Sequence, residues 1–272
     1  GTTESLRRRI TGAGDLQSVV RSMKALAASS IGQYEKAVSA LDDYTRSVEL
    51  GLSVCLREHG PQATGAESTS REAPAIGAIL FGSDQGLVGR FNEVLAEFAL
   101  HALAALPGNR RKIWAVGERI HALVTDAGHE AALLPVPTSV HHITPLVGRM
   151  LIGIEAAQGR GDAGEVHLFH NHPGAGAVYG PIAQRLLPLD PDWRHRLLGL
   201  PWPARVLPEV IGGVAPALSH FVRSYLFVRL FQACAESLAS ENASRLASMQ
   251  RAEKNIEDIL ETLNRRLHSL RQ

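Results

Sequence analysis

The sequence has no long hydrophobic run, few aromatic residues, two cysteines and almost no net charge. Its apolar runs fall far short of the roughly 18 residues that a membrane-spanning helix needs. Its start lacks the pattern of a secretory signal, so we expect no membrane span and no signal peptide. A net charge of +1 gives no general attraction to nucleic acid, and no nucleic-acid partner is predicted. Cys55 and Cys234 suggest reduced thiols in the core of a cytosolic protein rather than a disulfide framework.

Proline is confined to the middle of the chain. All 14 prolines lie between Pro61 and Pro216. Because proline interrupts a helix interior, only the two flanking segments can form long unbroken helices. We therefore expect a shaft and a globular insert. The predicted shaft comprises residues 1–58 and 213–272, the α/β domain 75–190, and the linkers 59–74 and 191–212.

The last fifty residues have the pattern of one long helix. Residues 221–272 contain neither proline nor glycine. Their apolar and small residues recur at alternating steps of three and four, which defines one helical face. At about 1.5 Å per residue the helix is roughly 75 Å long, and one apolar stripe of that length needs a partner helix. The stripe consists of Met249, Ala252, Ile256, Ile259, Leu263, Leu267 and Leu270.

The first part of the chain offers that partner. Residues 4–58 carry a seven-residue repeat, which predicts a helix in a left-handed two-helix supercoil. Since the insert begins and ends at one place, the two helices are expected to run antiparallel. Four glycines weaken this helix by up to about 1 kcal/mol each. They are Gly12, Gly14, Gly32 and Gly51.

The register of the pair follows from two segments of small residues. Residues 25–32 and 233–248 would let the helices approach closely, so we expect them to face each other. Paired residues then have numbers that add up to about 275. Arg7, Arg8 and Arg9 would lie beside Arg265 and Arg266 at the free end, where like charges need acidic surroundings.

The middle of the chain alternates short apolar runs with helical patterns, which predicts a Rossmann-like three-layer α/β domain with a largely parallel sheet. Residues 191–216 are rich in proline and tryptophan and should lead into the last helix. Strands are expected at 75–83, 112–116, 131–136 and 165–171, an extended segment at 177–189, and helices at 90–106, 117–127 and 139–158.

A glycine-rich turn follows the first predicted strand, from Gly82 to Asn92. Such a turn can hold a phosphate at a helix N-terminus. This one has neither the lysine and hydroxyl of a P-loop nor the G-x-G-x-x-G pattern. We favour a tight turn in which Asp84 and Asn92 bond local backbone.

Two histidines at the end of a strand suggest metal binding. His170 and His172 could both reach a zinc ion, and His-x-His-Pro resembles the motif of JAMM-type metalloproteases. That motif needs a third, acidic ligand soon afterwards, and the next aspartate is Asp190. The adjacent His141 and His142 diverge on a helix and are poor candidates. An ordinary strand end is the favoured interpretation.

Three stretches resemble the gamma subunit of F-type ATP synthases. The first, Val20–Ser29, is similar to the family's I-T-K-A-M-x-M-V-A-A-S. The second, Ser83–Asn92, is similar to S/T-D-R-G-L-C-G-G-x-N. The third, Glu236–Met249, is similar to E-x-x-A-S-E-x-x-A-R-M-x-A-M and is the most specific. Leu186–Leu189 fits as well, and the stretches occur in the right order.

The departures from the family pattern suggest a divergent or alternative-operon member. They are Val20, Lys24, Gln85, Arg90 and Leu246. The family usually continues beyond the position of Gln272, so we expect either a chain cut there or a shorter member.

The resemblance implies a rotor shaft within a ring of three alpha and three beta subunits, with the α/β domain near the epsilon subunit and the membrane c-ring. It also implies a peripheral location on the cytoplasmic face of a bacterial inner membrane, and no catalytic residue, cofactor or metal. Two alternatives stay open: a zinc-dependent hydrolase using His170 and His172, and a coiled-coil adaptor without a motor. The expected partner contacts are Arg7, Arg8, Arg9, Met23, Lys24, Arg245, Arg265, Arg266 and Arg271.

Overall fold

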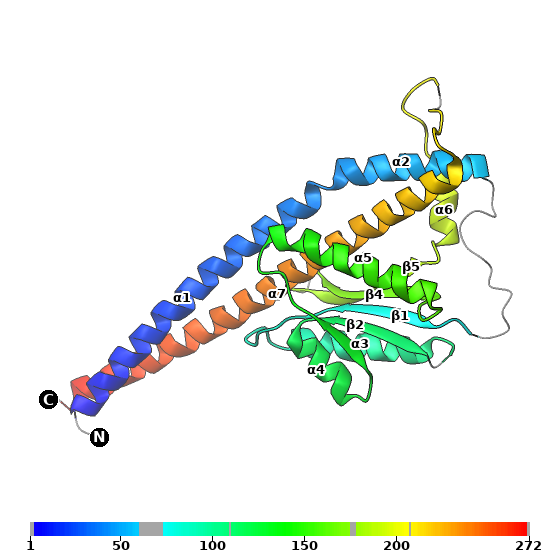
Figure 1. Ribbon diagram of the computed structural model, residues 1–272. Coiled ribbons are helices and arrows are strands. Elements are labelled where there is room, and N and C mark those ends of the chain that lie inside the picture. Colours follow the sequence, from blue (N-terminus) through cyan, green and yellow to red (C-terminus); the bar gives the residue numbers. More distant parts are fainter. Residues whose placement is uncertain (1–2, 60–72, 109, 175–177, 207, 271–272) are drawn as a thin grey trace.

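A pair of long helices projects from an α/β domain (Figure 1). The computed structural model describes residues 3–59, 73–108, 110–174, 178–206 and 208–270. In chain order its elements are α1 Thr3–Ser39, α2 Asp42–His59, β1 Ile76–Phe81, α3 Phe91–Ala105, β2 Arg111–Val116, α4 Glu118–Asp126, β3 Ala131–Leu134, η1 Val140–His142, α5 Ile143–Gly159, β4 Glu165–His172, β5 Gly180–Leu187, α6 Pro191–Leu198 and α7 Val214–Ser269.

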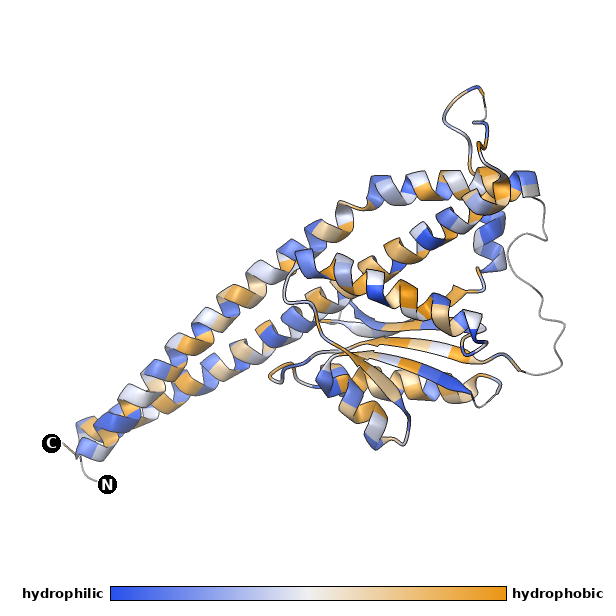
Figure 2. Ribbon diagram, in the orientation of Figure 1, coloured by the Kyte–Doolittle hydropathy of each residue, from blue (hydrophilic) through white to orange (hydrophobic). Residues whose placement is uncertain are grey.

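The shaft is the antiparallel pair of α1 and α7, with the start of α1 and the end of α7 together at its far tip (Figure 1). The predicted long C-terminal helix is confirmed as 56 unbroken residues. Hydrophilic and hydrophobic residues alternate along both helices, as one apolar stripe per helix requires (Figure 2). Two small clusters seal the seam beyond the domain: Leu6 with Leu263 and Leu267, and Val20 with Met249 and Ile256.

The prediction of one helix over 4–58 is wrong, because the helix breaks at Ala40 and Leu41. The Leu41 amide donates to Val38 O at 3.0 Å, a shorter-range bond that tightens the last turn of α1. Asp42 and Asp43 then occupy the first turn of α2, where negative charge favours a new helix start. The bend turns α2 along the domain end of α7 (Figure 1).

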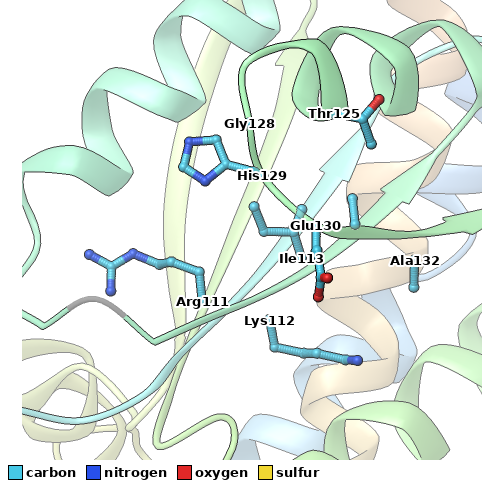
Figure 3. Close-up of a pocket in the computed structure, with 9 residues that line it drawn as sticks. Arg111, Lys112, Ile113, Thr125, Gly128, His129, Glu130 and Ala132 are labelled. Carbon is cyan, nitrogen blue, oxygen red and sulfur yellow. The ribbon is translucent and has the colours of Figure 1, made fainter.

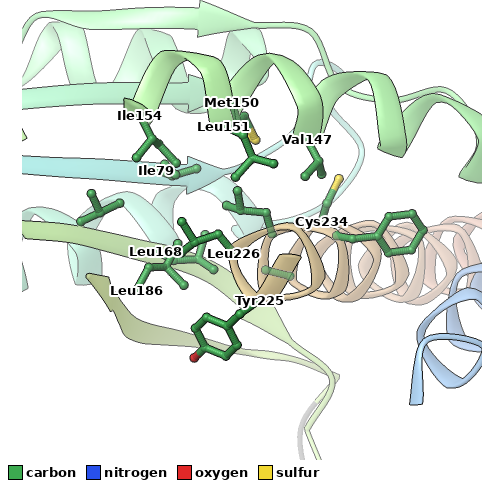
Figure 4. Packing of buried hydrophobic residues seen from close by; sticks show 14 of the residues in the cluster. Ile79, Val147, Met150, Leu151, Ile154, Leu168, Leu186, Tyr225, Leu226 and Cys234 are labelled. Carbon is green, nitrogen blue, oxygen red and sulfur yellow. The ribbon is translucent and has the colours of Figure 1, made fainter. Parts of the chain in front are cut away.

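The predicted α/β domain is confirmed, with strand order β3-β2-β1-β4-β5. All neighbours pair parallel except β4 and β5, which pair antiparallel. Helices α3 and α4 cover one face of the sheet, and their apolar residues pack on that side of β1 and β2. The other face carries the larger cluster, in which Met150 and Ile154 of α5 meet Leu168 of β4 and Leu226 of α7 (Figure 4).

Helix α6 was not predicted, and it lies in the segment 191–212 that was expected to be a linker. Asp190 caps it by accepting a bond from the Trp193 amide at 2.8 Å, and Pro191 occupies its first turn. This Asp-Pro pair is a known helix-start signal, so the sequence contained the information.

Helix α7 belongs to both parts of the molecule. Its small residues face the sheet as well as α1: Ser237 Oγ donates to Phe81 O at 3.0 Å, and Ser240 Oγ to Asn171 O at 3.1 Å. Ser244 Oγ donates to Val88 O at 2.5 Å. These bonds join α7 to the ends of β1 and β4 and to the turn after β1. Helix α7 therefore connects the domain to the shaft without a break.

Replacing Gly117 with alanine should strongly destabilise the domain. A Cβ there would lie 2.7 Å from backbone atoms of Ser83, and the φ of Gly117 is 114°. Gly128 is the matched control, since its φ is 88° but no atom lies within 4 Å of an added Cβ. We expect Gly128→Ala to cost about 1 kcal/mol from backbone strain and Gly117→Ala at least about 3 kcal/mol. Urea unfolding checks this, and equal losses would contradict the close approach.

Candidate functional site

The three stretches that carry the family resemblance meet around one hollow. It has a volume of about 420 Å³ and lies between α1, α7 and the turn after β1. Residues 20–29 contribute Met23 and Ala27, the turn contributes Asp84, and 236–249 contributes Glu241 and Arg245. Segments far apart in the sequence thus form one surface where the shaft leaves the domain.

A partly buried ion pair lies in the wall of this hollow. Arg245 Nη2 donates to Glu241 Oε1 at 2.6 Å, and its Nη1 donates to Asn242 Oδ1 at 3.1 Å. Burial raises the pKa of the Glu241 carboxyl, the charge of Arg245 opposes the rise, and the charge of Asp84 adds to it. Burial and the charge of Glu241 also raise the pKa of Tyr34 on α1. Arg245, an expected partner contact, is thus held by its own helix.

The turn after β1 is tight, as expected. Asn92 Oδ1 accepts from the Ser83 amide at 2.9 Å, and Asn92 Nδ2 donates to Ser83 Oγ at 2.8 Å. Asp84 differs from the prediction, because its Oδ1 accepts from the Glu118 amide at 2.9 Å and so binds the start of α4. The turn thereby ties β1, α3, α4 and, through Ser244, α7 together.

The predicted register of the shaft is confirmed. Arg21 Nε lies 2.9 Å from Glu253 Oε1, and Gln17 Nε2 lies 3.4 Å from Glu257 Oε1. Both pairs of residue numbers add up to 274, close to the expected value. Lys24 also bonds Glu253, so this expected partner contact has a partner within the chain. The hydrogen bonds from Lys24 and Arg21 lower the pKa of the Glu253 carboxyl.

The arginines at the free tip are exposed and only partly compensated. Arg8 pairs with Glu4 at 2.6 Å and Arg265 with Glu261 at 3.7 Å, each along its own helix. Arg7, Arg9 and Arg266 add three further positive charges on the same end. Arg271 lies outside the described residues. The tip is therefore a surface of net positive charge.

The two strand-end histidines meet a carboxylate that sequence reasoning did not find. His170 Nε2 lies 2.8 Å and His172 Nδ1 2.9 Å from the same oxygen, Oε2 of Glu236 on α7. Burial alone would raise the pKa of Glu236, but the bonds from both histidines, the charge of His170 and a bond from Gln232 lower it to about 2. Burial lowers the pKa of His170, against the opposing effect of Glu236. In the described part of the chain this is the one group of three such residues with metal-ligand spacing.

The remaining candidates from the sequence are two adjacent histidines and two cysteines, and the fold accounts for their positions. His141 and His142 are exposed, and His142 Nδ1 lies 2.9 Å from Ser139 Oγ. Cys55 and Cys234 are free and buried, as predicted, and burial raises the pKa of both thiols.

A larger hollow lies elsewhere, at the amino-terminal ends of β2 and β3 (Figure 3). Its volume is about 640 Å³, and Arg111, His129 and Glu130 are among its lining residues. Arg111 Nη2 donates to Leu103 O and Leu106 O at 3.0 Å each, which satisfies carbonyls at the end of α3. This hollow contains no residue of the three family-like stretches, and its arginine is explained by helix capping.

The fold is that of an ATP synthase central stalk. The central stalk in the Tetrahymena thermophila mitochondrial ATP synthase structure has a TM-score of 0.59 and 18% identity, covering 86% of this chain and 99% of that one. The rotor of the Euglena gracilis mitochondrial enzyme also has a TM-score of 0.59, with 13% identity, covering 100% and 98%.

The chain belongs to the ATP synthase family, whose sequence model matches residues 2–272. An ATP synthase gamma chain from Polynucleobacter asymbioticus is 22% identical over 100% of this chain and 93% of its own length. One from Frankia casuarinae is 26% identical, over 100% and 92%. The resemblance seen in the sequence is confirmed, and the hydrolase and adaptor alternatives are not favoured.

The ion pairs of Glu253 should make the shaft less stable in acid. Because the folded-state pKa of Glu253 is lowered, its contribution is present above the pKa of about 4.5 for an unpaired glutamate and is lost as the pH falls through the lowered value. Glu253→Gln should therefore lower the melting temperature at pH 7, and the difference from wild type should vanish in acid. Glu35→Gln, at an exposed site on α1, is the control. A difference that persisted at low pH would exclude the ionic origin.

Proposed function

We propose that this chain is the central rotor stalk of an F-type ATP synthase and couples ion flow through a membrane ring to conformational change at catalytic beta subunits. The observation that carries the proposal is the continuity of α7. It is packed into the domain at one end and forms half of the shaft at the other. A single helix without a break transmits torque without an intervening hinge.

The proposed mechanism is mechanical. The shaft is asymmetric, because one helix bends at Ala40 while the other runs straight through, and one side carries the domain. When such a rod turns inside a ring of three alpha and three beta subunits, each beta subunit meets a different face. Their nucleotide affinities then differ at any instant because the rod contacts each conformation differently. The chain itself would contribute no catalytic residue and no cofactor.

The proposed partners lie at the two ends of the molecule. The tip would enter the alpha–beta ring, and the domain would lie near an epsilon subunit and a membrane c-ring. Two solved relatives, a central stalk with its c-ring and a rotor, support the c-ring as a partner. No helix in the described part of the chain is long and apolar enough to cross a membrane. The proposed location is peripheral, on the cytoplasmic face of a bacterial inner membrane.

The residues proposed to contact the ring form two groups. The tip arginines in the described part of the chain are exposed, and the whole group would meet acidic partner surfaces, which steers assembly and fixes orientation. The second group is Met23, Lys24 and Arg245, at the junction with the domain. Lys24 is paired there with Glu253, and Arg245 with Glu241. The tip group consists of Arg7, Arg8, Arg9, Arg265, Arg266 and Arg271.

The structure adds an apolar stripe to this surface. Leu16, Val19 and Leu26 of α1 are 53%, 55% and 69% exposed, although they lie on a helix paired with α7. Their spacing of three and seven residues places them on one side of α1, and Leu26 also lines the hollow beside α7. Such a stripe would suit an apolar surface on the surrounding ring, because apolar contacts are not directional and would let the shaft turn.

Charge reversal at the tip should impair coupling. We expect Arg7→Glu/Arg9→Glu/Arg266→Glu to lower the coupled ATPase rate of a reconstituted complex several-fold, because acidic partner groups would then be repelled. Arg119→Glu/Arg149→Glu/Arg205→Glu changes the charge equally on exposed sites of the domain and its following loop, and should have less effect. Unchanged coupling in the tip variant would remove these arginines from the mechanism.

Polar substitution of the apolar stripe should weaken assembly without unfolding the chain. Leu16→Asn/Val19→Asn/Leu26→Asn removes side chains that are more than half exposed, so the melting temperature of the isolated chain should change little. Co-purification with alpha and beta subunits should fall. Ile152→Asn, 62% exposed on α5, is a single-site control for a polar substitution at an exposed apolar position outside the shaft. If the wild-type chain does not co-purify with these subunits at all, the rotor proposal itself fails.

A further inference from the structure

We propose that Nε2 of His170, Nδ1 of His172 and Oε2 of Glu236 bind one divalent transition-metal ion, for which zinc is the best chemical match. Two imidazoles and one carboxylate are a common zinc ligand set that leaves a fourth position for water. The proposal concerns binding alone and is independent of the rotor function.

The three ligand atoms come from different parts of the fold. The histidines end β4, and Glu236 lies 64 residues after His172, on α7. All three atoms lie within 4.8 Å of one another. The carboxylate that the sequence motif lacks after the second histidine is thus supplied by the helix packed across the strand.

The ligands stand on rigid, well-anchored elements. Between the histidines, Asn171 Nδ2 donates to Phe91 O at 3.0 Å, and its own carbonyl accepts from Ser240 of α7 at 3.1 Å. The second carboxylate oxygen of Glu236 accepts from Gln232 Nε2 at 2.9 Å, which orients the carboxylate. Supported ligands of this kind give defined geometry rather than a chance surface cluster.

The side-chain positions require a small adjustment to admit the ion. Ligand atoms at about 2.0–2.1 Å from a tetrahedral zinc lie roughly 3.4 Å apart, so the two nitrogens must each move about half an ångström from Oε2. The nitrogens themselves lie within 4.8 Å of each other and must come to the same spacing. His172 can do so easily because its side chain is 48% exposed, and that exposure also gives the ion a route in. His170 is 3% exposed and defines the fixed side of the site.

The surroundings of His170 limit the affinity for zinc. Nδ1 of His170 is buried and has no hydrogen-bond partner among the described residues. When Nε2 binds a metal, the ring proton must sit on Nδ1, and the carboxylate or carbonyl that usually accepts it is missing there. We therefore expect binding weaker by about tenfold or more than at a site with a complete second shell.

Zinc titration of the full-length chain, after chelator treatment and dialysis, tests the proposal. Calorimetry should show one ion per chain, and zinc should raise the melting temperature by mass action. His172→Ala removes an exposed ligand and should fold normally, and Glu236→Gln keeps the shape of the side chain. Both should bind zinc at least about tenfold more weakly and lose the thermal shift. The double variant His141→Ala/His142→Ala removes two exposed histidines and should behave like wild type.

Cobalt(II) provides a second readout, because a tetrahedral site produces intense visible absorption that octahedral aqueous cobalt lacks. We expect that absorption in the wild type and its loss in His172→Ala. If zinc does not bind stoichiometrically, or if His172→Ala binds it as tightly as wild type, the three residues form only a hydrogen-bonded contact and the proposal is overturned.

Discussion

The structure depends on the packing of α7 between α1 and the sheet. From Ala233 to Asn242 almost every residue of this helix is buried, although it also forms half of an extended shaft. Small side chains make this possible, because alanine and serine let α1 and α5 approach on one side and the strand ends on the other. The serines also form hydrogen bonds, since Ser237 and Ser240 donate to backbone carbonyls at the ends of β1 and β4, and Ser244 donates to one in the turn after β1.

This arrangement explains why the family-like stretches converge. Residues 20–29, 83–92 and 236–249 belong to a helix, a turn and a second helix, yet they enclose the junction of shaft and domain. Glu241 and Arg245 place a partly buried ion pair there, and a pair removed from water needs complete hydrogen bonding to be tolerated. The turn is fixed by Asn92 and Asp84 rather than left open for a ligand.

Much of the fold was readable from local patterns. The spacing of apolar residues predicted both shaft helices, because a helix face is defined by spacing alone, and two segments of small residues predicted their register. Strand and helix alternation predicted the sheet. The break at Ala40 was missed, because the stripe continues through it and the bend is favoured by the packing of α2 on α7 and α6. Helix α6 was missed even though Asp190 and Pro191 signal its start.

The sequence by itself determined the two long helices, their pairing, the α/β character of the middle and the family, since each of these rests on local periodicity or on contiguous motifs. Only the tertiary structure decided that α7 is shared between shaft and domain, that Lys24 and Arg245 are held within the chain, and that Glu236 meets His170 and His172. The physical reason is that these contacts join residues far apart in the chain. Their geometry is set by how helices and strands pack, and no spacing along the sequence encodes it.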